Sequence, residues 1–154
     1  MKHVPALIAA ALLAMSADAA VASTPGSDQL EAHLWQLARA TDAQGRRVDA
    51  LFVRGHAPYT LRFRSGFMSE LNLCNQVSNA YRLQGNLLIL RNGVQTAAQC
   101  IDPRMTVQQE RAGMLMRGGH SAPTLALDDH GALVLRNAQG DTAVFEPVAL
   151  QADE

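Results

Sequence analysis

The sequence predicts an α+β domain that is mostly antiparallel β-structure. It should hold seven or eight short strands in a partly closed, barrel-like sheet and one helix near residues 107–117. Two observations predict this. Short stretches of alternating apolar and polar residues are separated by turns rich in Gly, Asn and Asp, and a longer helical pattern occurs once, after Thr106. With 154 residues, of which 48% are hydrophobic and 18% charged, the chain can form one domain with its own core.

The charge of the chain excludes one class of partner. The formal net charge is -1 at pH 7, so the chain has no overall positive field that would attract nucleic acid. We therefore expect no nucleic-acid partner.

Residues 1–22 have the pattern of a secretory signal peptide. Lys2 provides a positive start, and residues 6–15 are apolar but too short to cross a bilayer. Cleavage is expected after Ala20-Val21-Ala22, with residues 17–19 as a competing site. No cysteine directly follows the apolar stretch, so we expect no lipid anchor, no membrane span, and a mature protein in the periplasm or outside the cell.

The mature chain is expected to begin with a flexible leader, residues 23–30, because Pro25 and Gly26 disfavour regular structure there. A single domain of residues 31–150 should follow.

The start of this domain can be interpreted in two ways. Leu30, Leu34 and Leu37 have helical spacing, whereas Leu34, Trp35 and Leu37 also suit the start of a strand. We expect a short helical turn followed by a strand through Trp35–Leu37. Trp35, the only tryptophan, should be a core residue.

Residues 58–64 form the clearest strand pattern. Leu61 and Phe63 should face the core, which leaves Arg62 and Arg64 together on the other face. A turn at Ser65-Gly66 should lead into a return strand over residues 67–73. Glu70 is expected on the exposed side of this hairpin, where it can pair with one of the two arginines.

Further strands and one helix complete the pattern. Residues 87–90 should form a strand that ends at Gly93, with a separate strand over 94–98. Thr106 and Gln109 have capping-box spacing, which predicts a helix over 107–117 closed by Gly118-Gly119. Met114 should be buried on this helix and Met116 exposed. Strands are expected over the C-terminal stretches 124–127, 132–136 and 142–147.

Cys74 and Cys100 are the two cysteines of the chain, and both lie after the expected signal peptide. In an oxidising compartment an isolated pair usually forms one bridge, which predicts a Cys74–Cys100 disulfide. Two buried free thiols are the alternative. There is no Cys-x-x-Cys motif, which argues against a redox-active pair.

Several small motifs occur in a fixed order along the chain. They are Trp35-Gln36-Leu37, Leu73-Cys74-Asn75, Asn79, Tyr81, Gly85 with Leu88, Thr96 with Cys100, Glu110, and a final group of Leu133, Leu135, Gly140 and Phe145. In this order and spacing the chain resembles the META domain family, whose bacterial members include the heat-shock-associated HslJ proteins. The family has Gly at the positions of Leu73 and Asn79. Asn tolerates a left-handed backbone, so Asn79 can preserve a turn.

The resemblance implies a small, β-rich domain of the periplasm or envelope, without an assigned chemical activity. The residues themselves add no catalytic constellation: we find no nucleophile motif, no metal-ligand spacing and no phosphate-binding loop. We therefore expect no enzyme activity, no cofactor and no metal.

A surface remains as the candidate site. Arg62, Arg64 and Arg82 are expected to share an outer sheet face that binds an anionic ligand or an acidic envelope protein. The alternative is a merely solvated face whose charges are paired with Glu70.

The expected function is thus a non-enzymatic, secreted domain that binds an envelope partner and supports envelope stress tolerance. An inhibitor of a periplasmic hydrolase, of protease or lysozyme type, is the alternative. For that function the loops 75–79 or 128–131 would enter the active site of the target.

Overall fold

The computed structural model describes residues 22–117 and 121–150. The expected signal peptide therefore lies outside the described residues, except for Ala22, and so does the expected Gly118-Gly119 helix end. The elements in order are α1 (Ser27–Glu31), β1 (His33–Thr41), the 3-10 helix η1 (Asp49–Leu51), β2 (Thr60–Arg64), β3 (Phe67–Leu71), β4 (Val77–Gln84), β5 (Leu87–Gln95), α2 (Pro103–Arg117), β6 (Thr124–Leu127), β7 (Leu133–Arg136) and β8 (Thr142–Ala149).

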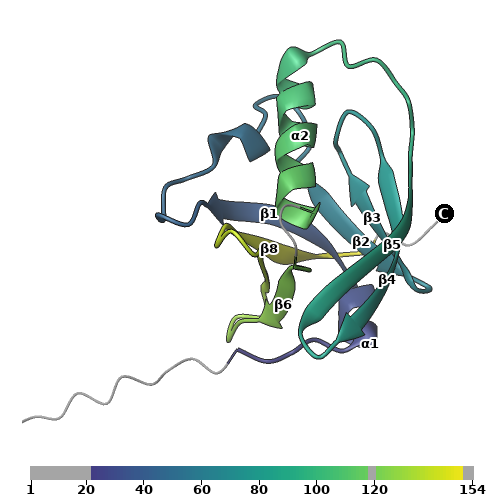
Figure 1. Ribbon diagram of the computed structural model, residues 1–154, viewed down its shortest axis with the longest axis vertical. Coiled ribbons are helices and arrows are strands. Elements are labelled where there is room, and N and C mark those ends of the chain that lie inside the picture. Colours follow the sequence, from purple (N-terminus) through teal and green to yellow (C-terminus); the bar gives the residue numbers. More distant parts are fainter. Residues whose placement is uncertain (1–21, 118–120, 151–154) are drawn as a thin grey trace, which may run out of the picture.

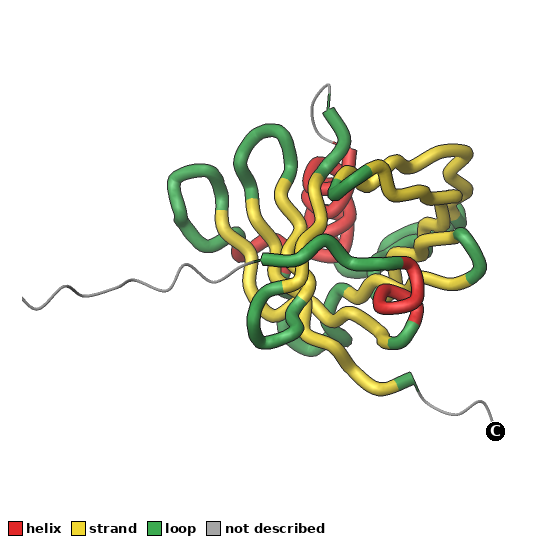
Figure 2. The backbone as a smooth tube through the Cα atoms, turned by 90° about the horizontal axis from the view of Figure 1, so that it is seen from below, coloured by secondary structure: helices red, strands yellow, loops and turns green. Residues whose placement is uncertain are grey.

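The eight strands form one antiparallel sheet that closes on itself in sequence order. Closure is made by β8, which pairs with β1 from His33↔Ala149 to Thr41↔Thr142. The weakest junction joins β5 to β6 through one residue pair, Leu87↔Thr124. Figures 1 and 2 show the resulting curved sheet, with α2 lying across one end. The predicted α+β class, mostly antiparallel with one main helix, is confirmed.

The core fills the inside of the closed sheet. Strand residues of one parity point inward, among them Leu61 and Phe63 on β2, as their alternation predicted. Phe145 on β8 packs edge-on against Tyr59, with ring centroids 5.7 Å apart. Among the described residues, no helix has the length and apolar character needed to cross a membrane.

The N-terminal end of the domain packs against the closed sheet. Residues 27–30, which the sequence assigned to a leader, belong to α1, and Leu30 is completely buried. The indole nitrogen of Trp35 donates to the Leu30 carbonyl at 2.8 Å. The predicted helical turn, the strand that follows it and the core position of Trp35 are therefore all present.

Helix α2 begins four residues earlier than predicted. Asp102 accepts a hydrogen bond from the backbone of Arg104, and Pro103 occupies the first helical position. Proline is favoured there because its missing N–H has no helical partner in any case. Leu115 and Met116 are buried on this helix and Met114 is 54% exposed, so the prediction for the two methionines was wrong.

Strand β5 continues through Gly93, so the predicted break into two strands was wrong. The pairing with β4 shifts between Ser78 and Ala80, and this irregularity accommodates the bend at Asn92, whose φ is 51°. A Cβ atom at Gly93 would collide with the side-chain oxygen of Asn79, so a larger residue there would displace that side chain. Asn79 itself lies in β4 and has no positive φ, so it does not form the left-handed turn expected of it.

Candidate functional site

The predicted Cys74–Cys100 disulfide is present, with the two Cα atoms 5.6 Å apart. It joins the β3–β4 connection to the segment that follows β5. Asn75 and Thr96 meet beside it, because the Thr96 hydroxyl donates to the side-chain oxygen of Asn75 at 3.1 Å. We call Cys74, Asn75, Thr96 and Cys100 the clamp.

Asn75 is the centre of the clamp and is only 9% exposed. Its side-chain oxygen also accepts from the Ala98 backbone at 2.6 Å, and its amide nitrogen donates to the Ala98 carbonyl at 3.3 Å. Its own backbone N–H donates to the Gln109 side chain of α2 at 2.6 Å. The polar groups of the clamp are thus bonded to one another and to α2, which indicates a structural role.

The remaining residues of the family pattern are also structural in their contacts. Tyr81 packs edge-on against Phe63, with ring centroids 5.0 Å apart, and burial raises the pKa of its phenol. Gly85 has a φ of 60° in the β4–β5 turn, a conformation that strongly favours glycine. In this turn, as at Trp35, the pattern specifies local geometry rather than an open site.

Glu70 is completely buried inside the closed sheet, so the prediction that it pairs with Arg62 or Arg64 outside was wrong. Its carboxylate accepts from the Tyr59 hydroxyl at 2.7 Å and from Arg117 at 3.0 Å. Burial, and then the negative charge of Glu70, raise the pKa of Tyr59 well above its usual value of 10.0. These partners lie 11 and 47 residues away in the sequence, so the chain around Glu70 gives no sign of them.

The three arginines expected to share a face do so. Arg62 pairs across the sheet with Ser69, and Ser69 pairs with Ser78, so the side chains of Arg62, Ser69 and Ser78 point to the same outer side. Arg64 opposes Phe67 in the next row, and Arg82 follows on β4 with the same parity. Phe67 is 53% exposed between them.

A fourth arginine was missed from the sequence. Arg91 pairs with Ala80, and Ala80 pairs with Phe67, so Arg64 and Arg91 lie at the two ends of one row across four strands. The alternation from Ile89 could have indicated Arg91, but the strand was expected to cover only residues 87–90. We call this set the arginine face: Arg62, Arg64, Arg82 and Arg91.

The arginine face carries positive charge without compensation. No outward position of β2 to β5 is acidic, and none of the four arginines forms an ion pair with any residue that the structure describes. A shallow hollow of about 370 Å³ lies on it, bordered by Arg62, Arg64 and Phe67. The face therefore offers guanidinium groups beside an exposed aromatic ring.

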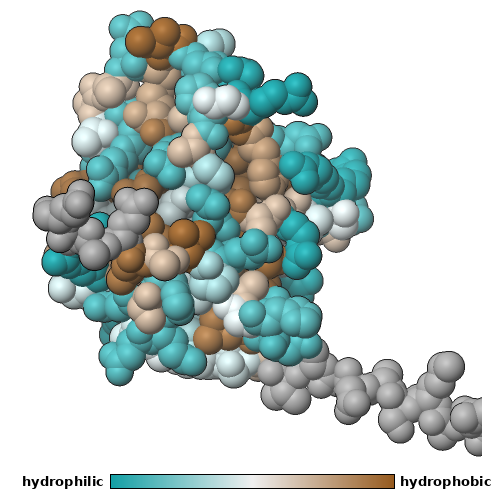
Figure 3. Space-filling model, turned by 180° about the vertical axis from the view of Figure 1, so that it is seen from behind, coloured by the Kyte–Doolittle hydropathy of each residue, from teal (hydrophilic) through white to brown (hydrophobic). Residues whose placement is uncertain are grey.

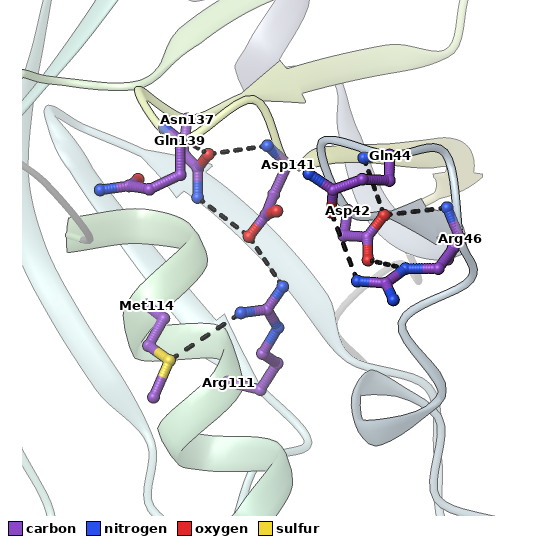
Figure 4. A network of polar contacts seen from close by, with 8 residues as sticks. All are labelled: Asp42, Gln44, Arg46, Arg111, Met114, Asn137, Gln139 and Asp141. Atoms are coloured by element: carbon purple, nitrogen blue, oxygen red, sulfur yellow. Dashed lines mark hydrogen bonds and ion pairs between the residues drawn. The ribbon is translucent and has the colours of Figure 1, made fainter.

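Several other charged groups bond to partners within the molecule. Figure 4 shows Arg111 of α2 reaching the turn between β7 and β8, where it contacts Asp141 at 2.7 Å. In the same view Asp42 accepts from Arg46 and Gln44. Burial acts to raise the pKa of Asp42, but these hydrogen bonds lower it overall. Such contacts fix α2 and the turns in place.

The two loops considered as inhibitory differ in exposure. Residues 75–79 do not protrude, because Asn75 and Asn79 are buried and Val77 already belongs to β4. Residues 128–131 form an exposed turn in which the Asp128 carboxylate accepts from the backbone of His130 and Ala132 at 3.0 and 2.8 Å. Within residues 22–117 and 121–150, no three His, Cys, Asp or Glu side chains gather in a way that suits a metal ion.

Comparison with known proteins identifies a family and a fold. The family model described as META domain matches residues 28–149. An NMR structure of a protein from Burkholderia xenovorans matches with a TM-score of 0.64 and 18% identity, covering 94% of this chain and 99% of its own. A second protein solved by NMR matches with a TM-score of 0.57 and 18% identity, covering 80% and 95%. No curated protein matches. At this identity the two structures establish similarity of fold alone.

Proposed function

We propose that this chain, which belongs to the META domain family, is a non-enzymatic domain that binds an anionic envelope protein through its arginine face. We place it in the periplasm or outside the cell, where it would support envelope stress tolerance. A disulfide supports such a compartment, because disulfides persist in oxidising surroundings. The signal-like pattern of residues 1–22 supports it independently.

The absence of a proposed chemical step follows from where the unusual ionisable groups lie. Among the groups with clearly shifted pKa, Tyr59 is bonded to Glu70, Asp42 to Arg46, and Asp102 to Arg104, while Tyr81 packs against Phe63. These structural contacts account for the pKa shifts without a catalytic role, so we propose no chemical step.

The observation that carries the proposal is the arginine face itself. Arg62 and Arg64 border a hollow with Phe67, Arg82 and Arg91 lie farther along the same outer side, and no carboxylate of the described residues pairs with any of the four. Arginine and aromatic residues are enriched at the energetic centres of protein interfaces, and guanidinium binds carboxylates in a two-pronged geometry. An acidic protein surface with an apolar contact for Phe67 would match both features.

The test compares two double variants. Arg64→Gln with Arg91→Gln removes both ends of the row through Phe67, whereas Arg39→Gln with Arg136→Gln removes two exposed arginines elsewhere. Binding to a fluorescent poly-glutamate peptide is measured by anisotropy at low and high salt. We expect about tenfold weaker binding for the first variant, unchanged binding for the control, and weaker binding at high salt.

A second arm identifies the natural partner by crosslinking the wild-type protein in envelope extract. The proposal requires a stoichiometric protein that the Arg64/Arg91 variant no longer captures. Equal binding by both double variants, or a partner indifferent to either, would show that the face is only solvated. Preference for an anionic glycan over the acidic peptide would replace the proposed protein partner.

Inhibition of a hydrolase is the second candidate, and the turn 128–131 favours it. This turn is exposed and held by its own hydrogen bonds, which suits a rigid element inserted into a cleft. Inhibition assays with protease and lysozyme panels test it, with His130→Ala as the variant. No inhibition by the wild-type protein would exclude those enzyme classes.

A further inference from the structure

A groove lies on a different part of the molecule from the arginine face. It runs between the end of β1, the irregular segment around η1, and the first turns of α2. Its volume is about 780 Å³, the largest among the hollows described here and within the usual range of about 300–1,000 Å³ for small-molecule sites.

The floor of this groove is apolar. Leu37, Leu51 and Tyr59 lie beneath it and are almost fully buried, so the apolar surface that a ligand can reach comes from side chains such as Phe52, Val53 and Val107. Val107, in the second turn of α2, also borders it and is 51% exposed. Figure 3 shows the molecule from the side opposite to that of Figure 1. On that side the exposed hydrophobic residues form small, separate patches among hydrophilic ones.

Hydrogen bonds and ion pairs tie the walls of the groove to one another. The buried side chain of Gln108 donates to the Leu51 carbonyl at 2.9 Å, which ties α2 to η1. The Arg47 guanidinium lies 4.2 Å from the centre of the Phe52 ring and contacts Asp49 at 2.6 Å. A groove whose walls are already ordered loses little conformational entropy when a ligand enters.

The second tie joins the far end of the groove to the start of α2. His56 contacts the Asp102 carboxylate at 3.1 Å, and Arg104 contacts it at 2.7 Å. The Arg104 hydrogen bonds hold the pKa of the Asp102 carboxyl well below its usual range, so this group keeps its charge and its helix-capping role.

The charges at the rim are unequal. Arg47, Arg54 and Arg104 line the groove, whereas Asp49 is the acidic residue that lines it. Arg47 and Arg104 are engaged with Asp49 and Asp102. Arg54 is exposed and forms no ion pair with any residue in the described part of the chain. One uncompensated cation therefore stands beside an apolar floor.

We propose that this groove binds a small amphipathic carboxylate, with its apolar chain against Phe52 and Val107 and its carboxylate at Arg54. The apolar floor supplies most of the affinity through buried area, and the guanidinium selects an anion over a neutral molecule of the same shape. This site is separate from the arginine face, and its occupation does not depend on the function proposed for that face.

The test uses octanoate as the probe and 1-octanol as the neutral probe of equal chain length. Each is titrated into ¹⁵N-labelled protein, and backbone amide shifts are followed. We expect octanoate to cause saturable shifts at residues 51–54 and 104–107. Octanol should bind the same residues about tenfold more weakly, since it cannot pair with Arg54.

Two variants separate the charge from the apolar wall. Arg54→Gln should weaken octanoate binding about tenfold, to the level of octanol, and leave octanol binding unchanged. Val107→Glu places a carboxylate on the apolar wall and should abolish octanoate binding. Met114→Glu is its matched control, because Met114 is equally exposed on α2 but does not line the groove.

Three results would overturn the proposal. One is the absence of saturable shifts up to about 10 mM octanoate, a concentration that would detect even the weak affinities typical of such a small ligand. Another is a set of shifts centred on the arginine face, at residues 62–67 and 80–91. The third is equal binding of octanoate by wild-type and Arg54→Gln protein, which would show that the Arg54 guanidinium does not bind the carboxylate.

Discussion

The clamp lies in the segments that adjoin β4 and β5, and the arginine face lies on β2 to β5, but the two regions satisfy their polar groups in opposite ways. In the clamp, Asn75 and Thr96 bond to each other, and Asn75 also bonds to the backbone of Ala98. On the arginine face, four guanidinium groups point outward with no acidic residue in the described chain to pair with them. Groups already satisfied inside a protein stabilise its fold, whereas unpaired exposed groups remain free to bind something else.

Two adjacent residues of β3, Ser69 and Glu70, show the same difference between an outer and an interior polar side chain. Ser69 belongs to the outer side of β3, where Arg62 opposes it, whereas Glu70 points inward to Tyr59 and Arg117. The carboxylate that could have neutralised the arginine face is used in the interior instead. We therefore expect substitutions of interior polar groups to change stability and substitutions on the arginine face to change binding.

The largest expected loss of stability follows from opening the clamp. Replacing Cys74 and Cys100 by Ala frees a loop closed over a separation of 26 residues, and the chain-entropy estimate is about 3–4 kcal/mol. Urea unfolding with and without reductant measures it. The wild-type protein should lose this stability on reduction and the double variant should not respond. Without urea, at a temperature at which the double variant is folded, it should still bind poly-glutamate. Loss of this binding would show that the clamp and the arginine face are coupled.

Glu70→Ala should cost about 3 kcal/mol, because it leaves the buried Tyr59 hydroxyl without its acceptor and removes the partner of Arg117. Glu70→Gln keeps an acceptor for Tyr59 and should cost about half as much. Urea unfolding gives both values. If Glu70→Ala were as stable as the wild-type protein, the interior position of this carboxylate would have no structural value.

The pH dependence of stability should reflect Tyr59, the buried partner of Glu70, with an effect of about 1 kcal/mol. The pKa of Tyr59 is raised above 10.0 in the folded protein, so above pH 10 the unfolded chain binds fewer protons than the folded one. Stability is therefore unaffected by this group below pH 10 and falls as the pH rises above it. The slope is at most about 1.4 kcal/mol per pH unit.

Tyr59→Phe is the control for this effect. It removes the titrating hydroxyl and should remove that part of the alkaline slope, measured by urea unfolding at pH 8 and at about pH 11. Tyr81, whose pKa is also raised, remains in both proteins and cancels in the comparison. Identical slopes for the two proteins would contradict the assignment to Tyr59.

The smallest effect on stability is expected on the arginine face. Arg64→Gln with Arg91→Gln should change the free energy of unfolding by less than about 0.5 kcal/mol, since both side chains are exposed and unpaired. Binding to poly-glutamate should nevertheless fall. A large loss of stability in this variant would mean that the arginines act in the fold after all.

Sequence reasoning was most reliable where neighbouring residues carry the information. The alternation from Tyr59 to Phe63 identified β2 and its two faces, and the cysteine pair identified the disulfide. The start of α2 could also have been predicted, because Asp before Pro is a favourable cap and first residue of a helix, but the prediction rested on the capping-box spacing at Thr106 alone. The assignment of Met114 and Met116 was wrong because the buried side of α2 is set by its contacts with distant segments such as η1.

The sequence by itself determined the antiparallel class, the arginines shared by one face, and the family pattern of the clamp. Each depends on periodicity, on residue type or on order along the chain. Only the tertiary structure decided that Glu70 is interior, that Arg91 joins the arginine face, and that Arg54 borders an apolar groove. These results depend on which distant strands and helices meet when the sheet closes, and a local pattern cannot carry that information because the partners are far apart in the chain.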